Sequence, residues 1–175
     1  MYTYKRTIKS GDMIEVEYYQ SIRKIGKNYG GRKSNNSLSP AKMRKANKLR
    51  AVKRMQRLIN ANFGSGDFFC RFSAPYGTYE SEKEFRAEVG KWLYRINYRR
   101  KKQGKGRLKY IAFIECGKSG KNWHIHIIVS KEDRELLSEQ WPYENGQNFT
   151  PLYKNENFKK LAEYITKDLT GKEDV

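Results

Sequence analysis

Residues 110–129 read YIAFIECGKSGKNWHIHIIV and decide the fold, because two apolar runs flank a short polar segment. The runs 110–115 and 123–129 predict buried β-strands, and Gly117 and Gly120 between them are typical of a turn. We expect the two runs to pair as an antiparallel hairpin. The remaining elements are then expected to pack around this hairpin.

The two histidines of the chain, His124 and His126, both lie in the second strand. Side chains two residues apart in a strand share a face, so Ile125 and Ile127 point to the opposite face. Pairing of the strands brings Glu115 close to the histidines. Two imidazoles and one carboxylate can hold a divalent metal ion and leave coordination positions open. The alternative is a pair of ordinary, hydrogen-bonded sheet histidines.

The flanking segments predict an α+β fold, a sheet with helices packed on one side. Strands are expected over residues 2–9, 13–19 and 68–74, and helices over 40–60, 82–103, 130–140 and 155–169. Ser81 and Glu84 form a capping box at the start of the second helix. The segment that contains Pro142, Gly146 and Pro151 is expected to be a loop.

The composition is strongly basic, since 37 Lys and Arg against 19 Asp and Glu give a formal net charge of +18. A polyanionic partner would remove this self-repulsion, and 13 Tyr, 8 Phe and 3 Trp add stacking surfaces suited to single-stranded nucleic acid. The alternative is a basic domain whose aromatic residues all lie in its core. No secretion signal and no membrane-spanning apolar run is visible. Cys70 and Cys116 are too few for a disulfide framework, so we expect a reduced, cytoplasmic setting.

No nucleotide cofactor is expected, although residues 117–119 read GKS like the end of a phosphate-binding loop. That motif requires a glycine five residues before Gly117, and this position holds Ala112. The sequence therefore excludes a motor driven by nucleotide hydrolysis.

The helix expected over 40–60 carries eight cations and no acidic residue between positions 41 and 57. Like charges four residues apart repel each other, and a phosphate backbone would remove that repulsion. We predict DNA contacts from Lys42, Arg44, Lys45, Lys48, Arg50, Lys53, Arg54 and Arg57. The apolar stripe of this helix is expected to comprise Met43, Leu49, Val52, Met55 and Leu58. The alternative is a solvated surface helix.

The final helix is expected to carry Tyr164 and Lys167 on one flank of its buried stripe. That stripe comprises Phe158, Leu161, Ala162, Ile165 and Leu169. A phenol with its usual pKa of about 10 becomes a nucleophile when a nearby positive charge favours the phenolate. Lys167 and a bound metal ion would both supply such a charge. The alternative is an interfacial tyrosine beside a solvated lysine.

Three segments, in this order, resemble the motifs of the HUH endonucleases. FFCRFSAP (68–75) is similar to their first motif strand, with Ser73 where threonine is usual. FIECGKSGKNWHIHIIV (113–129) resembles their histidine–hydrophobe–histidine motif with an upstream glutamate. LAEYITKDL (161–169) resembles their Tyr-x-x-Lys motif. The chain most resembles the single-tyrosine replication initiators of bacterial plasmids, phages and integrative elements.

The resemblance implies an HUH-type fold over residues 62–175, with an antiparallel sheet of about five strands flanked by helices. Residues 1–61 would form a DNA-binding extension made of the N-terminal β-hairpin and the basic helix. The implied site residues are Glu115, His124 and His126 as ligands of Mn²⁺ or Mg²⁺, Tyr164 as nucleophile, Lys167 as its cationic partner, and Arg71 and Ser73 as DNA contacts.

The resemblance also implies nicking and rejoining of single-stranded DNA at a replication origin through a 5′-phosphotyrosine link. A host helicase and polymerase would be partners in the bacterial cytoplasm. A transposase or relaxase with the same chemistry is an alternative, although relaxases usually carry a third histidine and single-tyrosine transposases a glutamine after the tyrosine. The alternative from another class is a non-catalytic basic domain that binds nucleic acid.

Overall fold

The computed structural model of the chain describes residues 1–22, 39–153 and 157–167. The chain divides into two compact units, residues 1–62 with the segment from 157 onward, and residues 63–156. Each unit contains helices and an antiparallel sheet, so the predicted α+β class is confirmed. No helix in these described ranges is long and apolar enough to cross a membrane.

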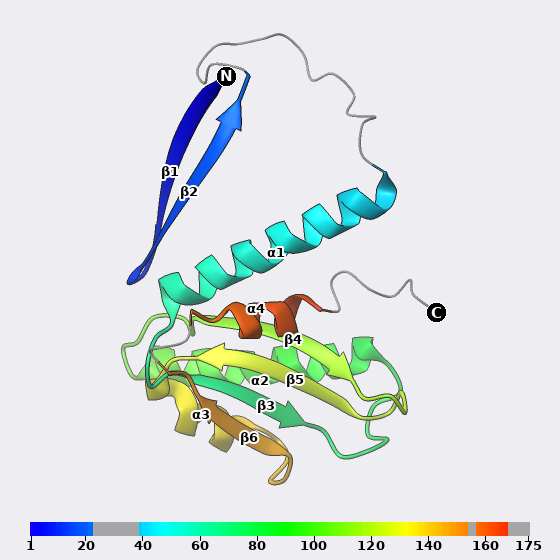
Figure 1. The fold of residues 1–175 in the computed structure, drawn as a ribbon. Coiled ribbons are helices and arrows are strands. Elements are labelled where there is room, and N and C mark those ends of the chain that lie inside the picture. Colours follow the sequence, from blue (N-terminus) through cyan, green and yellow to red (C-terminus); the bar gives the residue numbers. More distant parts are fainter. Residues whose placement is uncertain (23–38, 154–156, 168–175) are drawn as a thin grey trace. The chain divides into compact units, whose positions relative to one another are not determined.

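The second unit is built on a four-stranded antiparallel sheet (Figure 1). Its strands lie in the order β4 (Tyr110–Cys116), β5 (Trp123–Val129), β3 (Phe68–Ser73) and β6 (Gln147–Pro151). β4 and β5 form the predicted hairpin, and β5 lies between β4 and β3. Within the described residues this sheet has four strands, whereas about five were expected.

Strand β6 occupies a segment for which the sequence predicts a loop, so that prediction is wrong for residues 147–151. Gly146 precedes the strand and Pro151 ends it, and both residue types are typical of turns. Among the described residues β6 pairs only with β3, and an edge strand tolerates a terminal proline. Its register sets Asn148 opposite Arg71.

Helices α2 (Glu82–Lys102) and α3 (Arg134–Gln140) pack on one face of this sheet, and a 3₁₀ turn at Lys131–Asp133 precedes α3. α2 begins as predicted, since the backbone N–H of Glu84 donates to the Ser81 Oγ at 3.3 Å. The Glu84 carboxylate in turn accepts a hydrogen bond from the backbone N–H of Glu80 at 3.1 Å. Ser130 occupies the N-cap position of this turn, but its side chain forms no capping hydrogen bond.

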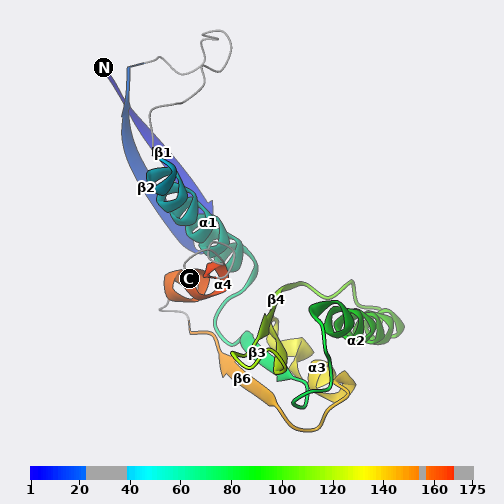
Figure 2. The same cartoon turned by 90° about the vertical axis from the view of Figure 1, so that its right-hand side faces the viewer.

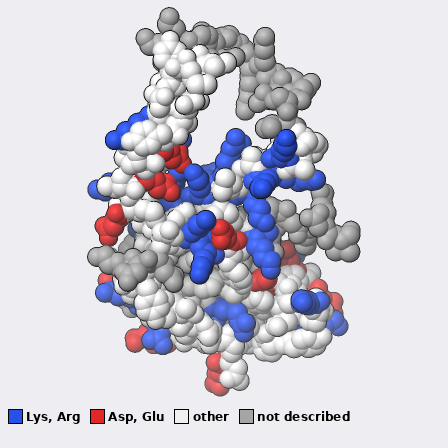
Figure 3. Space-filling model, in the orientation of Figure 1, with Lys and Arg blue, Asp and Glu red and all other residues white. Residues whose placement is uncertain are grey.

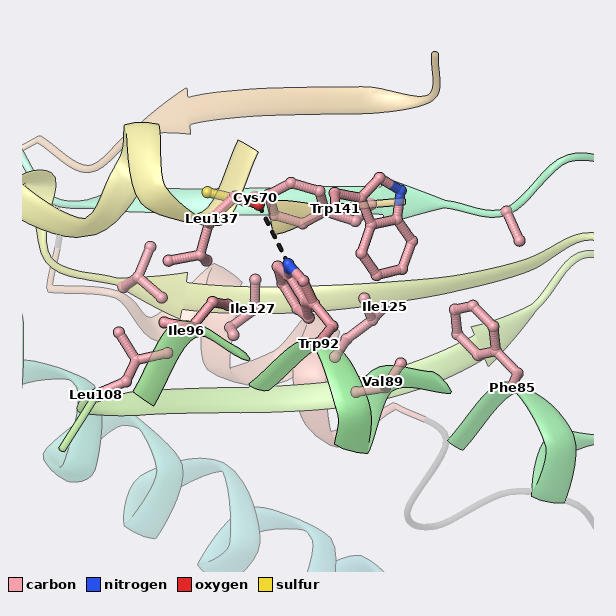
Figure 4. Packing of buried hydrophobic residues seen from close by; sticks show 13 residues of the cluster. Cys70, Phe85, Val89, Trp92, Ile96, Leu108, Ile125, Ile127, Leu137 and Trp141 are labelled. Carbon is pink, nitrogen blue, oxygen red and sulfur yellow. Dashed lines mark hydrogen bonds between the residues drawn. The ribbon is translucent and has the colours of Figure 1, made fainter. Parts of the chain in front are cut away.

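The core between these helices and the sheet determines which face is left for the histidines (Figure 4). Its fully buried members include Phe85, Trp92, Ile96, Cys70, Phe72, Ile127 and Leu137. The Trp92 indole N–H donates to the carbonyl oxygen of Leu137 at 3.2 Å and so ties α2 to α3. Because Ile125 and Ile127 point into this core, strand alternation turns His124 and His126 to the opposite face.

The first unit contains β1 (Tyr2–Ser10), β2 (Met13–Ser21), α1 (Pro40–Asn62) and α4 (Lys159–Thr166). The β1–β2 hairpin carries acidic residues that pair with α1. Arg57 lies 2.6 Å from the Glu15 carboxylate and 3.2 Å from that of Glu17, and Lys53 lies 2.7 Å from Glu17. The hydrogen bond from Lys53 lowers the pKa of the Glu17 carboxyl below its usual value. Two of the eight α1 cations thus have carboxylate partners within the protein.

Helix α4 packs along the C-terminal half of α1 (Figure 2). The buried residues of the two helices are Val52, Gln56 and Ile59 on α1, and Ala162, Ile165 and Thr166 on α4. The side-chain amides of Gln56 and Asn60 donate to the carbonyl oxygen of Asn157 at 2.7 and 3.1 Å. These bonds fix the backbone two residues before α4 begins.

The buried line of α1 differs from the predicted apolar stripe. Val52 is buried as predicted, but Met43, Leu49 and Leu58 are exposed. The buried residues all lie in the C-terminal half of α1, where α4 packs, and the N-terminal half is solvated. In α4, Ala162 and Ile165 are buried as predicted and Leu161 is half-buried, whereas Leu169 lies outside the described residues.

Candidate metal centre and tyrosine helix

The β4–β5 hairpin brings Glu115, His124 and His126 together. Its register sets Glu115 directly opposite His124. The Glu115 Oε2 lies 3.3 Å from the His124 Nε2 and 3.1 Å from the His126 Nε2. The three potential ligand atoms all lie within 4.8 Å of one another. The structure therefore groups the three residues that the sequence predicts as metal ligands.

The turn of the hairpin holds this pairing in register. The backbone N–H of Gly117 donates to the carbonyl oxygen of Asn122 at 2.9 Å, and Gly120 has a φ of +71°, a conformation that favours glycine. The Nδ1 of His124 lies 3.2 Å from the same Asn122 oxygen. A carbonyl oxygen only accepts, so a proton on Nδ1 would make this contact a hydrogen bond and would leave the Nε2 lone pair of His124 facing Glu115.

Two electron-rich atoms then face each other, because the Glu115 carboxylate is also a lone-pair donor. Such atoms at 3.3 Å repel unless a cation lies between them, either a proton or a metal ion. A ring nitrogen that points to a backbone carbonyl while the other is free to bind is the usual arrangement of a metal-binding histidine. The donor set is therefore suited to a cation.

His126 is the more deeply buried of the two rings. It stacks between Phe113 and Phe69, with ring centroids 4.8 and 5.3 Å from its own. Burial, and secondly the neighbouring His124, lower the pKa of His126 to about 4, outweighing the attraction of Glu115. His126 is therefore neutral near pH 7, which leaves a nitrogen lone pair available for coordination.

Two of the three separations between the potential ligand atoms match those of ligands that share one divalent ion. Nitrogen and oxygen ligands bind such ions at about 2.1 Å, so adjacent ligands at octahedral or tetrahedral angles lie about 3.0–3.4 Å apart. The Glu115 Oε2 meets both histidines within that range, at 3.1 and 3.3 Å. Imidazole nitrogens and carboxylate oxygens are both ligands of divalent metal ions in proteins.

Other polar side chains continue across the same face of the sheet. On β3, Ser73 lies opposite His124 and Arg71 opposite His126. Asn148 on β6 lies opposite Arg71. Arg71 and Ser73 thus lie beside the three potential ligands, and Asn148 extends the row. The sequence did not single out Asn148, because only a predicted strand over 147–151 would have assigned it to this face.

Tyr164 lies on α4, outside the buried line of that helix. Its side chain is 40% exposed, whereas Ala162 and Ile165 are buried. Lys167 follows the last residue of the helix, and its backbone N–H donates to the Tyr164 carbonyl oxygen at 3.2 Å. Both side chains are exposed and lie three residues apart, which puts them on one flank as predicted.

The α1 cations fall into two groups. Lys53 and Arg57 are half-buried and pair with Glu15 and Glu17. The other six are exposed, and lysine and arginine side chains gather over α1 in Figure 3: Lys42, Arg44, Lys45, Lys48, Arg50 and Arg54. The exposed group is available to a polyanion, whereas Lys53 and Arg57 form ion pairs with the β1–β2 hairpin.

A family model described as Replication-associated protein ORF2 matches residues 77–173, which is more than half of the chain. The matched range includes Glu115, His124, His126, Tyr164 and Lys167. No curated protein and no solved structure shows significant similarity to the chain.

Proposed function

The chain belongs to the ORF2 family of replication-associated proteins, and we propose that it starts rolling-circle replication of a mobile element by nicking single-stranded DNA at the origin. The observation that carries this proposal is the group Glu115, His124 and His126, whose potential ligand atoms all lie within 4.8 Å of one another. A family with a role in replication requires DNA contact, and the charge of +18 suits it.

Glu115, His124 and His126 would hold Mn²⁺ or Mg²⁺, which as a Lewis acid would polarise an oxygen of the scissile phosphate. Arg71 and Ser73 lie beside these ligands on β3. Both side chains can donate hydrogen bonds to phosphate oxygens, and so orient the DNA backbone against the sheet. Asn148, one strand further, offers an amide for the next nucleotide.

Tyr164 would attack the phosphorus atom. Its oxygen forms a bond to phosphorus, the bond from phosphorus to the 3′-oxygen breaks, and that oxygen takes up a proton to become a free 3′-OH. The phenol proton is lost to solvent, and the positive charge of Lys167 on the same flank favours its loss. The 5′-phosphotyrosine ester conserves the energy of the broken bond, so a later 3′-OH can reverse the step and rejoin the strand.

The packing of α4 on α1 supports a link between DNA binding and attack. Gln56 and Asn60 of α1 hold the Asn157 carbonyl oxygen at the entrance to α4. The exposed cations of α1 and the Tyr164 hydroxyl therefore belong to one compact unit. DNA held on α1 would be held in a fixed relation to the nucleophile.

A host helicase would separate the strands, and a host polymerase would extend the 3′-OH in the bacterial cytoplasm.

A labelled library of single-stranded DNA with random sequence tests the proposal. With Mn²⁺ or Mg²⁺, 3′-labelled DNA should give a protein band that keeps its label in SDS, because Tyr164 stays on the 5′ end of the downstream fragment. The 5′-labelled library should give only shortened free DNA, and EDTA should abolish both products. DNA binding without any cleavage would instead favour the non-catalytic alternative.

Neutralising exposed α1 cations should weaken DNA binding in a salt-dependent way. In Lys42→Gln/Lys45→Gln/Lys48→Gln, the slope of log affinity for oligothymidylate against log salt should become shallower by about 2, at about 0.7 for each lost phosphate contact. The control Lys83→Gln/Arg86→Gln/Lys91→Gln removes three charges from α2. An equal change of slope in both variants would show that only net charge matters and would contradict a specific role of α1.

A further inference from the structure

A second basic site lies on the helical side of the second unit. A pocket of about 830 Å³ runs beside the C-terminal half of α2 and the loop that follows it. Four cations line it, Lys101, Lys102, Lys105 and Arg107, and none of the described residues around it is acidic. This volume is in the range of pockets that bind small molecules or parts of larger ligands. Four like charges around one pocket indicate an anionic ligand.

Two tyrosines form the wall of the same pocket. Tyr94 and Tyr98 lie four residues apart on α2, so their rings stand on one face of the helix. Their side chains are 72% and 49% exposed, so the core does not account for them. The ammonium of Lys102 lies 4.8 Å from the centre of the Tyr98 ring. Exposed rings interleaved with cations are the usual platform for the bases and phosphates of single-stranded DNA.

Gly90 leaves room for a ligand at the pocket. It lies inside α2, where glycine is less favourable than alanine because it costs backbone entropy. A Cβ added at Gly90 would have no atom within 4 Å, so packing does not require the absence of a side chain. A ligand that approaches the helix backbone at this point would require it.

The pocket is separate from the metal centre. The other side of α2 supplies Phe85, Val89, Trp92 and Ile96 to the core. That core also contains Ile125 and Ile127, whose neighbours His124 and His126 point to the opposite face of the sheet. The two sites therefore lie on opposite sides of the sheet of this unit.

We propose that this pocket binds a short segment of single-stranded DNA, with bases stacked on Tyr94 and Tyr98 and phosphates bound by Lys101, Lys102, Lys105 and Arg107. This gives the protein a second DNA contact, which holds the strand away from the reaction centre. The proposal needs DNA as ligand but does not depend on cleavage chemistry. A variant of the pocket therefore lowers DNA affinity and leaves formation of the covalent adduct at saturating DNA unchanged.

Three variants test the proposal through their affinity for oligothymidylate, measured by fluorescence anisotropy. Tyr94→Ala/Tyr98→Ala should bind about tenfold more weakly or worse, because stacking contributes strongly for each base. Lys101→Gln/Lys105→Gln should bind more weakly with a salt slope shallower by about 1.4. Gly90→Leu, which places a bulky side chain in the pocket and removes no charge, should also bind about tenfold more weakly while its melting temperature is maintained or raised.

The control Lys83→Gln/Lys91→Gln removes two charges from α2 outside the pocket and should bind nearly like the parent. Irradiation with 5-iodouracil-substituted single strands should cross-link a peptide that contains Tyr94 or Tyr98. Gly90→Leu should leave the affinity for a DNA duplex of equal length unchanged. Parent-like affinity in both Gly90→Leu and Tyr94→Ala/Tyr98→Ala, or cross-links at other peptides only, would overturn the proposal. If the parent protein forms no adduct but its DNA affinity still depends on the pocket residues, the proposed cleavage is wrong and the proposed pocket is still supported.

Discussion

Replacing Tyr164 with phenylalanine is expected to abolish the covalent protein–DNA adduct and to slow strand cleavage at least about 10⁴-fold. The substitution removes only the oxygen that forms the bond to phosphorus. Tyr164 is 40% exposed, and its helix is held by Ala162, Ile165 and Thr166, so the fold should remain. The affinity for oligothymidylate should stay within a few-fold of the parent. Gel analysis with 3′-labelled DNA and anisotropy measure the two quantities.

The matched control is Tyr153→Phe, which removes the hydroxyl of another exposed tyrosine. This control should form the adduct at the parental rate. An adduct that persists in Tyr164→Phe would show that a different side chain is the nucleophile. The proposed attack by α4 would then be wrong, although a metal-dependent nuclease would still be possible.

Removing two of the proposed metal ligands is expected to have the second largest effect on the rate of strand cleavage. His124→Ala/Glu115→Gln leaves one of the three donors, and loss of the charge stabilisation by a metal ion costs several kcal/mol, or about 10³-fold in cleavage rate. Neither side chain belongs to the hydrophobic core, so the variant should fold. His126 is retained because its ring is stacked between Phe69 and Phe113.

Metal binding gives a readout that does not need DNA. Mn²⁺ should bind the parent at one site by calorimetry, and at 100 times its Kd should stabilise the folded protein by about 2.7 kcal/mol. The double variant should lose this stabilisation. The control Glu163→Gln removes an exposed carboxylate from α4 and should keep it. Equal Mn²⁺ stabilisation of parent and double variant would contradict the assignment of Glu115 and His124 as ligands.

The grouping of Glu115, His124 and His126 could be predicted from the sequence because it depends on two local rules. Alternation in a strand puts both histidines on one face, and a hairpin with a short turn fixes which residue lies opposite. The apolar residues between the histidines then decide which face is buried. All of this information is contained within residues 110–129.

The parts that could not be predicted depend on contacts distant in the sequence. Strand β6 is defined by its pairing with β3, about eighty residues earlier, and its own residues are typical of turns. The carboxylate partners of Lys53 and Arg57 come from the N-terminal hairpin, so the charge pattern of α1 alone could not reveal them. The grouping of α4 with α1 likewise depends on tertiary packing.

The first residue of α4 also could not be predicted from the sequence. The helical pattern predicts a beginning near residue 155, whereas α4 begins at Lys159. Phe158 precedes it with a φ of 52°, a left-handed conformation that is unfavourable for a residue with a side chain. Burial of the Phe158 ring and the hydrogen bonds to Asn157 stabilise this turn. Helix periodicity carries no information about such a turn.

Mass spectrometry of the covalent adduct is a direct test of metal-dependent attack by Tyr164 on DNA. The parent protein is incubated with single-stranded DNA and Mn²⁺, denatured, and digested with protease and nuclease. We expect one modified peptide that carries a nucleotide 5′-phosphate on Tyr164, and no such peptide in the presence of EDTA. A phosphate on another residue, a linkage to a 3′-phosphate, or an adduct that forms without a divalent ion would contradict the account.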